Sequence, residues 1–425
     1  MSDFFKPADP KLGMLWFTDA ITPGFLKLAH NINEVIIAPE DKKMLRSLRD
    51  DRLIYFSNHP TQAEPTISWL VGQAMGARFK GMAARRAFDF GFGLVGKVFQ
   101  STGAFSVVPG VADRESMSFA RKVLAAPKGK LTLYPEGEPM SSENDSLMPF
   151  QPGILKIGFA GLGDAMKQDP AADITILSSF IKYVIDAKEE VIRKDLEHYV
   201  GILCNKLGVE PGKRNLLRSF LMLGRVMIEK AEKDYGLPAA DNEDFDFRMG
   251  RIRHHLLDHV ADKLGAPGYD READAIHKLR HLTTITELIH LKYPMKGLPT
   301  PTAAELSWAE DELVRAYDFI VIKKDYLVSY PSAERFYEWL ARWESLLLGK
   351  RPRMLGGEPS HLPRKAYVSF AKPFRLREYQ DVYKKDKKGT LETVLGRLRT
   401  EMEALLEESM RLTHTLVEPY DVGET

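Results

Sequence analysis

A histidine and a glutamate in one short loop are the residues of this sequence best suited to acid–base chemistry. His59 and Glu64 follow an apolar run, 53–56, that has the character of a buried strand, and they precede a helical pattern. Pro65 suits the first position of that helix, where its missing N–H would have no partner. A carboxylate beside an imidazole fixes the tautomer of the ring and stabilises its charged form, so the second ring nitrogen can accept a proton. The pattern indicates a general base, although His59 could instead cap the helix.

Strand-like and helix-like segments alternate along the first half of the chain. Buried apolar runs predict strands, and apolar residues at helical spacing predict the helices between them. The expected strands are 53–57, 78–82, 104–108, 131–134 and 174–181, and the expected helices are 65–75, 88–100, 114–126 and 152–162. This alternation predicts an α/β fold with a largely parallel sheet flanked by helices. Ligands of such sheets bind beyond the carboxyl ends of the strands, which is where the loops carrying the candidate residues should meet.

The segments at these strand ends resemble the sequence blocks of the phospholipid/glycerol acyltransferase family, which includes glycerol-phosphate and lysophosphatidate acyltransferases. Asn58-His59-x4-Glu64 is similar to the Asn-His-x4-Asp motif of the family. Three later blocks follow in the family's order at 103–109, 134–137 and 174–183. Near the end of the chain, a strand-like run, a Lys-Pro turn and a long helix also resemble the end of the family's domain.

The resemblance implies an O-acyltransferase. The enzyme would move an acyl chain from acyl-CoA or acyl carrier protein to a hydroxyl of a glycerolipid-type acceptor, such as glycerol-3-phosphate or a lysophospholipid. His59 would act as the general base, oriented by Glu64, and Glu136 with Gly137 would shape the acceptor site. The resemblance implies no metal and no cofactor beyond the acyl thioester, which is a donor substrate. The expected partners are this donor and a lipid acceptor.

Several cationic and polar residues are candidates for substrate binding. Besides the catalytic pair, these candidates are Asn58, Arg85, Arg86, Arg114, Glu136, Gly137 and Lys156. Lys156 lies near the start of an expected helix, whose N-terminus could bind an anion. Each cation could equally be solvated surface charge, and the Pro-Glu-Gly turn could serve only to let Gly137 adopt a positive φ.

The sequence departs from the family's blocks where the phosphate of an acceptor would bind. Pro109 stands where the family commonly has an arginine, and 138–139 reads Glu-Pro in place of Thr-Arg. Arg114, or the pair Arg85-Arg86, could rebuild the contact with a phosphate. The drift also leaves an alternative open, a non-catalytic lipid- or acyl-binding protein on a diverged acyltransferase fold. The retained base and its carboxylate partner favour the enzyme.

The texture of the sequence changes after residue 186 to long, charged, amphipathic helical stretches. The clearest are 188–207, 215–235, 244–264 and 271–291, with more helix around 303–317 and 333–348. We therefore expect an N-terminal helical segment over 1–45, an acyltransferase α/β domain formed by 46–186 and 362–415, and an all-helical insertion over 187–361. A strand over 366–370 is expected to rejoin the sheet of 53–57.

Histidines in the expected insertion have a spacing that could bind a metal. His255 and His259 form one pair four residues apart, and His277 and His281 form another, with His290 nearby. Such spacing places two imidazoles on one face of a helix. The neighbouring carboxylates lack the regular Glu-x-x-His pairing of metal-binding bundles. Polar helix faces or pH-sensitive packing are more ordinary uses of such histidines, and we predict no metal site.

Composition limits the classes of partner and the compartment. The chain has 425 residues and a net charge of +1, without the basic surplus that nucleic-acid binding usually requires. Its single cysteine, Cys204, cannot form an internal disulfide and fits a reducing compartment. No apolar run is long enough to span a bilayer. These features predict a cytoplasmic protein that is either soluble or in peripheral contact with the inner face of the membrane.

The first 32 residues are rich in apolar side chains, including Trp16 and Phe17. Pro23 is expected to start or break a helix there. An interfacial helix that places these two rings in a membrane is one interpretation. A helix packed on the body of the domain is the other, and the thin cationic face favours it.

Overall fold

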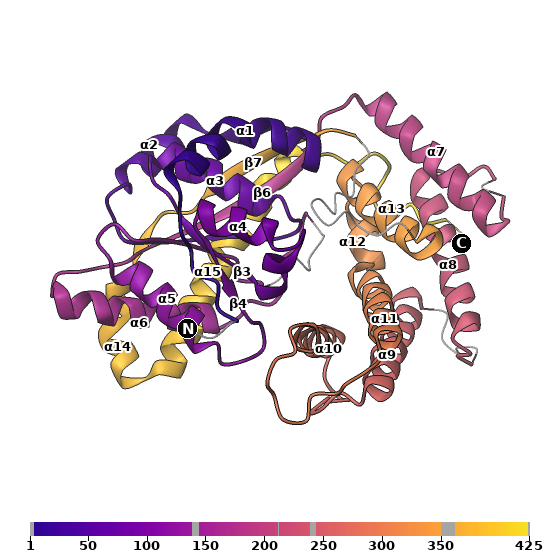
Figure 1. The fold of residues 1–425 in the computed structure, drawn as a ribbon. Helices are drawn as coiled ribbons and strands as arrows, with labels where there is room; N and C mark the ends of the chain where they lie inside the picture. Colours follow the sequence, from indigo (N-terminus) through magenta and orange to yellow (C-terminus); the bar gives the residue numbers. More distant parts are fainter. Residues whose placement is uncertain (1–3, 138–143, 211, 239–243, 350–361, 424–425) are drawn as a thin grey trace. The chain divides into compact units, whose positions relative to one another are not determined.

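The structure, a computed structural model, describes residues 4–137, 144–210, 212–238, 244–349 and 362–423. The chain divides into two compact units (Figure 1). The first, here called the sheet unit, comprises Met1–Val184 and Pro363–Leu412. The second, here called the helical unit, comprises Ile185–Leu362 and Thr413–Thr425.

The sheet unit is built on an eight-stranded sheet with the order β1-β7-β6-β2-β5-β3-β4, and β8 pairs with β6. The strands are β1 (Ile32–Ile37), β2 (Leu53–Ser57), β3 (Lys80–Ala84), β4 (Ala104–Val107), β5 (Lys130–Leu133), β6 (Thr175–Ile185), β7 (Arg364–Phe370) and β8 (Phe374–Arg375). Strand β2 pairs in parallel with β5 and β6, β3 pairs in parallel with β4 and β5, and β1 pairs in parallel with β7. Only β8 is shown to run antiparallel to its described neighbour. The predicted α/β fold with a largely parallel sheet is confirmed.

Strand β2 lies at the centre of the sheet and is buried along its whole length. Its side chains alternate between two apolar clusters, because successive residues of a strand point to opposite faces. Ile54 and Phe56 pack in one cluster with side chains of α5, α6 and α15. Leu53 and Tyr55 pack in the other with side chains of α1, α2 and α3. Burial on both faces explains why β2 is continuously apolar rather than alternating.

Helices cover both faces of the sheet (Figure 1). They are α1 (Leu12–His30), α2 (Pro39–Ser47), α3 (Glu64–Met75), α4 (Leu94–Thr102), α5 (Arg114–Ala125), α6 (Gly153–Gln168), α14 (Gln380–Lys385) and α15 (Lys387–Ser409), with short 3₁₀ turns η1 (Arg85–Asp89), η2 (Leu376–Tyr379) and η3 (Met410–Leu412). The expectation that Pro23 starts or breaks a helix is wrong, because α1 begins at Leu12 and continues through Pro23 to His30.

The expected helix 88–100 is instead divided into η1 and α4. Gly91, Phe92 and Gly93 all adopt positive φ between them, which no helix can contain. Helix α4 also packs closely against η1: a Cβ on Gly96 would lie only 2.3 Å from the carbonyl oxygen of Phe88. Gly91 and Gly93 permit the break in the helix because glycine adopts positive φ readily. The apolar spacing alone predicted one continuous helix.

Strand β1 was not predicted by the sequence, because its burial pattern is irregular and its partner β7 lies more than three hundred residues away. The expected strand 366–370 does rejoin the sheet as β7, separated from β2 only by β6. Strands β1 and β7 belong to the same sheet as β2, the strand that precedes the loop of His59, so the chain leaves this sheet after β6 and returns to it.

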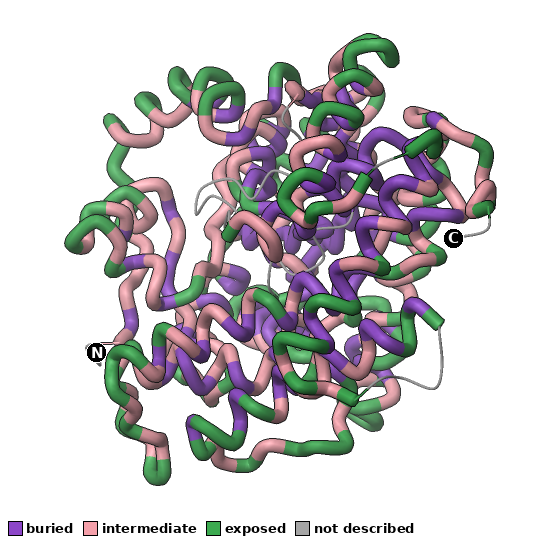
Figure 2. Tube along the Cα trace, turned by 90° about the vertical axis from the view of Figure 1, so that its right-hand side faces the viewer, coloured by how far each residue is buried: buried purple, intermediate pink, exposed green. Residues whose placement is uncertain are grey.

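The helical unit contains α7 (Glu189–Leu207), α8 (Leu216–Asp234), α9 (Phe245–Leu264), α10 (Ala275–His290), α11 (Ala303–Val321), α12 (Lys324–Ser329) and α13 (Ala333–Leu348). Side-chain caps begin most of these helices, and Thr302 with Glu305 forms a capping box at α11. Helix α13 is buried along most of its length, with Trp339 and Trp343 in edge-to-face contact. Figure 2 shows buried and exposed residues alternating along the helices, as expected where one face packs on a core. No described helix has the length and apolarity that a membrane crossing needs.

Candidate functional site

The loop that follows β2 brings a histidine and a buried carboxylate into contact. His59 leaves the end of β2, and Glu64 is the first residue of α3, with Pro65 directly after it. The Nδ1 atom of His59 lies 2.8 Å from Oε2 of Glu64. The carboxylate is fully buried, whereas the imidazole is 11% exposed. Because an ionised carboxylate can only accept, Nδ1 carries the proton and Nε2 keeps its lone pair. No described residue hydrogen-bonds to Nε2.

Glu64 is held in place by donors to both of its oxygens. Oε2 also accepts from the main-chain N–H of Thr61 at 3.2 Å, and Oε1 accepts from the Thr61 hydroxyl at 2.9 Å and from the hydroxyl of Tyr183. Burial alone would raise the pKa of the Glu64 carboxyl, but the hydrogen bonds and charge of His59 and the bonds from Tyr183 and Thr61 outweigh it. The pKa of Glu64 therefore lies below its usual value, and the group is ionised at neutral pH.

An aromatic ring fixes the orientation of the imidazole. The ring of Tyr134 stacks on His59 with centroids 4.2 Å apart and an interplanar angle of 29°. The hydroxyl of Tyr134 is within 3.1 Å of the Ser68 hydroxyl, on the inner side of α3. The ring of His59 is thus held by a stacking face and by a hydrogen bond, which is how proteins fix an imidazole for proton transfer.

Glu136 holds the backbone beneath the histidine. One of its oxygens accepts from the main-chain N–H of His59 at 2.8 Å, and the other accepts from the N–H of Met148 at 2.8 Å. Burial raises the pKa of Glu136, and the two backbone bonds oppose that rise. Gly137 closes the turn at φ +87°, with its N–H bonded to the carbonyl of Tyr134 at 3.0 Å. The pair expected to shape the acceptor site therefore shapes the loop that carries the base.

Beyond the end of β2, the side chains of two asparagines hydrogen-bond the main chain of β6. The last paired residue of β2 is Ser57, opposite Ser179. After it, the Asn58 amide donates to the Ile181 carbonyl at 3.0 Å and accepts from the Ile181 N–H at 2.8 Å. The Asn144 amide bonds the main chain of Tyr183 in the same way, at 2.7 and 2.9 Å. Asn58, a candidate for substrate binding, is engaged with the main chain and directs the loop toward His59.

The comparison with protein families identifies the segment that contains this site. Residues 37–181 match the family model described as Acyltransferase. This segment is an acyltransferase-family domain. The match begins at the last residue of β1 and ends within β6, so it includes the loops of His59, Glu64 and Glu136. Comparisons with curated proteins and with solved structures gave no match. This match supports acyl transfer at a general level.

The candidate cations of the acyltransferase domain differ in how accessible they are. Arg85 is buried, and its guanidinium bonds Asp89 at 2.7 Å. Arg86 is half-buried at the end of β3, and Arg114 is exposed at the first position of α5. Lys156 is exposed in the first turn of α6. Pro139, at the second position where the family has an arginine, lies outside the described residues.

The sheet order places these cations at increasing distances from the base. Along the edge formed by the carboxyl ends of β2, β5, β3 and β4, neighbouring strands are about 4.8 Å apart. The end of β3, which precedes the turn η1 that contains Arg86, is then roughly 10 Å from the end of β2, and the end of β4 is roughly 14 Å away. The Asp113 carboxylate caps α5 and accepts from the Val108 N–H at 2.9 Å, which fixes the loop before Arg114. Arg86 and Arg114 therefore flank the site on one side.

The histidine pairs of the helical unit are engaged in separate contacts. His259 lies edge-to-face with Trp308, and His281 is 2.9 Å from the Pro267 carbonyl. His277 contacts the carboxylate that caps its helix, and His290 bonds Glu310 at 2.8 Å. Within the described parts of the chain, no three His, Cys, Asp or Glu side chains are grouped as a metal ion would require.

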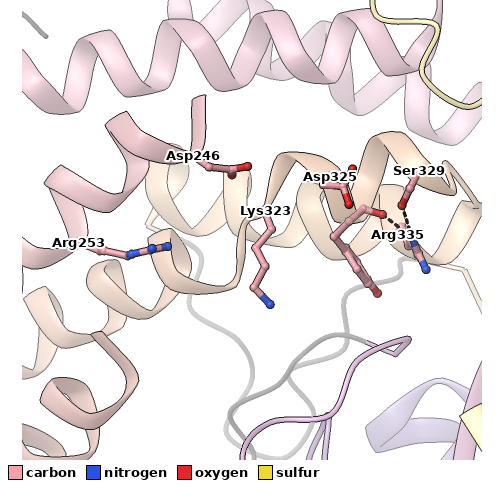
Figure 3. A pocket seen from close by; sticks show the side chains of 7 residues that line it. Asp246, Arg253, Lys323, Asp325, Ser329 and Arg335 are labelled. Atoms are coloured by element: carbon pink, nitrogen blue, oxygen red, sulfur yellow. Dashed lines mark hydrogen bonds between the residues drawn. The ribbon is translucent and has the colours of Figure 1, made fainter. Parts of the chain in front are cut away.

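The helical unit also contains an open pocket of about 530 Å³ (Figure 3). It is lined by three cationic, two acidic and two hydroxyl side chains: Asp246, Arg253, Lys323, Asp325, Tyr326, Ser329 and Arg335. Arg335 bonds the Tyr326 carbonyl and approaches the Ser329 hydroxyl at 3.4 Å, and Asp246 accepts from the Lys324 N–H at 3.0 Å. Arg335 and Asp246 are therefore engaged with neighbouring groups, whereas Nε of Arg253 has no hydrogen-bond partner among the described residues. The pocket lining contains no histidine–carboxylate pair like that of His59 and Glu64.

A second buried histidine makes the stability of the sheet unit depend on pH. Burial lowers the pKa of His30 to about 4, and the nearby charge of Glu64 only partly offsets this effect. The unfolded chain, with an ordinary histidine pKa near 6.5, binds more protons than the folded chain between these two values. We expect the free energy of unfolding to fall as the pH decreases from about 6.5 to 4.

Denaturant unfolding at a series of pH values measures this dependence. His30→Gln removes the titrating group, so its free energy of unfolding should fall less steeply over the same range. His277→Gln, at an exposed position of α10, should retain the slope of the wild type. Equal slopes in wild type and His30→Gln would show that His30 is not kept neutral by folding.

Proposed function

We propose that the chain is an O-acyltransferase that moves an acyl group from acyl-CoA or acyl carrier protein to a hydroxyl of a glycerolipid-type acceptor. The single observation that supports this most is the His59–Glu64 pair within an acyltransferase-family segment. A buried, ionised carboxylate on Nδ1 leaves Nε2 as a base, which is what an alcohol needs before it can attack a thioester. The enzyme would meet its lipid acceptor by peripheral contact with the inner face of the membrane.

The proposed reaction is a direct attack. The acceptor hydroxyl gives its proton to Nε2 of His59 while its oxygen attacks the carbonyl carbon of the thioester. The imidazolium that forms is stabilised by the Glu64 carboxylate at 2.8 Å, in surroundings largely shielded from water. The tetrahedral oxyanion then collapses, the carbon–sulfur bond breaks, and the leaving thiolate takes the proton from Nε2. The products are an ester and a free thiol.

This reaction requires no covalent acyl-enzyme and no resident cofactor, because the thioester already activates the acyl group. The one cysteine of the chain is a poor candidate for a nucleophile. Cys204 is buried in α7, and burial raises the pKa of its thiol. Ser178 and Ser179 of β6 bond Glu401 and Tyr55, respectively, and so serve the packing of the sheet.

Arg86 and Arg114 are proposed to bind the phosphate of a phosphorylated acceptor. Replacing Arg114 by alanine should raise the KM for the acceptor by roughly 10- to 100-fold, since a charge-assisted hydrogen bond contributes about 1.5–3 kcal/mol. The kcat should change little, because the contact exists before the reaction as well as during it. Arg86→Ala should act in the same direction. Steady-state kinetics with varied acceptor measure both constants.

Arg121→Ala provides the matched control on the same helix. Arg121 pairs with Asp164 of α6 and should not affect the KM for the acceptor. If neither Arg114→Ala nor Arg86→Ala raises this KM, the acceptor is not a phosphate monoester. A direct comparison of acceptors tests the same point: we expect glycerol-3-phosphate or lysophosphatidate to be acylated. Transfer to an uncharged lipid alcohol alone would contradict the phosphate contact.

A further inference from the structure

Helix α1 turns its acidic side chain toward the protein and its apolar side chains outward. Asp19 accepts hydrogen bonds from Trp69 at 2.8 Å and Gln73 at 2.6 Å, both on α3, and from the guanidinium of Arg78. Burial would raise the pKa of Asp19, but these bonds hold it below the usual value. The contacts fix α1 on α3 by its polar side, so the helix cannot rotate to bury its other face without breaking them.

The outer half of α1 is apolar and exposed. Its large exposed side chains are Leu12, Trp16, Phe17, Ile21 and Leu28, and Trp16 and Leu28 are 66% and 84% exposed. Gly13, Ala20, Pro23 and Gly24 lie between them at exposed positions. A helix whose outer face meets water has its polar side chains on that face and its apolar side chains against the core, and α1 has the opposite arrangement. The packed helix favoured by the sequence is present, but its packing leaves Trp16 and Phe17 outside.

A neighbouring segment adds further exposed apolar side chains. Phe92 is fully exposed and has a φ of +56°, and Leu94 and Val98 of α4 are about half exposed. Helix α4 packs against α1, and main-chain bonds join Asp9 and Lys11 to the end of α4. Two features of Phe92 are unfavourable: its apolar ring is exposed to water, and its positive φ is a conformation that residues other than glycine rarely adopt. A partner that covers the ring would remove the first cost.

We propose that this docking face, formed by the outer half of α1 and residues 92–98, inserts into the interface of an anionic lipid bilayer. Its charged side chains at exposed positions of α1 and α4, within the described chain, are Lys27 and Lys97. An apolar centre with aromatic rings and a cationic rim is the pattern of helices that lie in a membrane interface. Each lysine would face anionic headgroups. A second copy of the chain that docked through the same face would offer these lysines no acidic partner from the exposed positions of α1 and α4.

The inference rests on the part of the proposed function that places the acceptor in a membrane, and it names the surface that meets it. Flotation of the full chain with vesicles tests it. Wild type should bind vesicles of phosphatidylcholine with phosphatidylglycerol and bind pure phosphatidylcholine more weakly. Trp16→Ser combined with Phe92→Ser should lower the partition coefficient by about tenfold or more. Lys27→Gln combined with Lys97→Gln should remove most of the preference for anionic vesicles.

Controls separate this claim from folding and from catalysis. Thermal unfolding should confirm that the variants keep the wild-type Tm, because the replaced side chains are exposed. Val382→Ser, an exposed apolar side chain on α14, should bind vesicles like the wild type. His59→Ala should also bind like the wild type, so that flotation is independent of acyl transfer. Equal partitioning of Trp16→Ser/Phe92→Ser and wild type would overturn the inference, as would a dimer in solution that this double variant abolishes.

Discussion

Replacing His59 by alanine is expected to slow acyl transfer by a factor on the order of 10²–10⁴, the usual effect of losing a general base. Without Nε2, the acceptor hydroxyl would have to lose its proton to water as it attacks the thioester. The loss should appear in kcat, because the proton moves in the transition state. Steady-state rates of ester formation, compared between the purified wild type and the variant, measure it.

The fold should survive this change. The contact that holds the loop, from the main-chain N–H of residue 59 to Glu136, does not involve the imidazole. His59→Gln fills more of the space against Tyr134 and should be as inactive as His59→Ala. His277→Ala, at an exposed histidine of α10, should keep the wild-type rate. A well-folded His59→Ala chain with substantial activity would rule out the proposed base.

Replacing Glu64 by glutamine should slow the reaction by roughly 10²-fold or more, since the imidazolium would lose its buried counter-charge. The site should accept the amide without rearrangement. Its oxygen can face Nδ1 of His59 and the Thr61 N–H, while its NH₂ group can face the hydroxyls of Thr61 and Tyr183, which can turn to accept. The tautomer of His59 is then preserved, and the loss of rate measures the contribution of the negative charge of Glu64.

Glu64→Asp separates the effect of the carboxylate charge from the effect of side-chain length. The shorter side chain keeps the charge but lacks one methylene, so we expect partial activity, between those of wild type and Glu64→Gln. Tyr183→Phe removes one hydrogen-bond donor to the Glu64 carboxylate, so the pKa of Glu64 should rise. The acidic limb of the pH–rate profile should then move to higher pH. Wild-type rates in Glu64→Gln would show that the carboxylate only packs against the ring.

The centre of the site could be predicted from the sequence because its signals are local. A buried strand, a short loop and a proline-marked helix start place His59 beside Glu64 without information from elsewhere. The parallel arrangement of strands then brings the loop of Glu136 to the same edge. The predicted bounds of β2 and the start of α5 agree with the structure to the residue.

The contacts that support the site could not be predicted, because they join distant residues and no motif indicates which side chains meet. Tyr183 reaches Glu64 across more than a hundred residues, and Asn144 completes the edge of β6 from a loop with no recognisable pattern. The bonds of Glu136 to the main-chain N–H groups of His59 and Met148 could not be predicted either, since its motif suggests contact with the substrate. The sequence could not decide between the two interpretations of α1 for a different reason: apolar spacing indicates which residues share a face of a helix, but not whether that face is covered.

The most direct test of the account follows both products of a single reaction. The purified chain is incubated with radiolabelled acyl-CoA or acyl carrier protein and with glycerol-3-phosphate or a lysophospholipid in anionic vesicles. Free thiol and labelled ester are then measured together. We expect equal amounts of free thiol and labelled ester, formed only when an acceptor is present. Thiol released without ester would indicate hydrolysis, and a bound thioester that is never consumed would indicate a lipid- or acyl-binding protein; either result would contradict the proposed transferase.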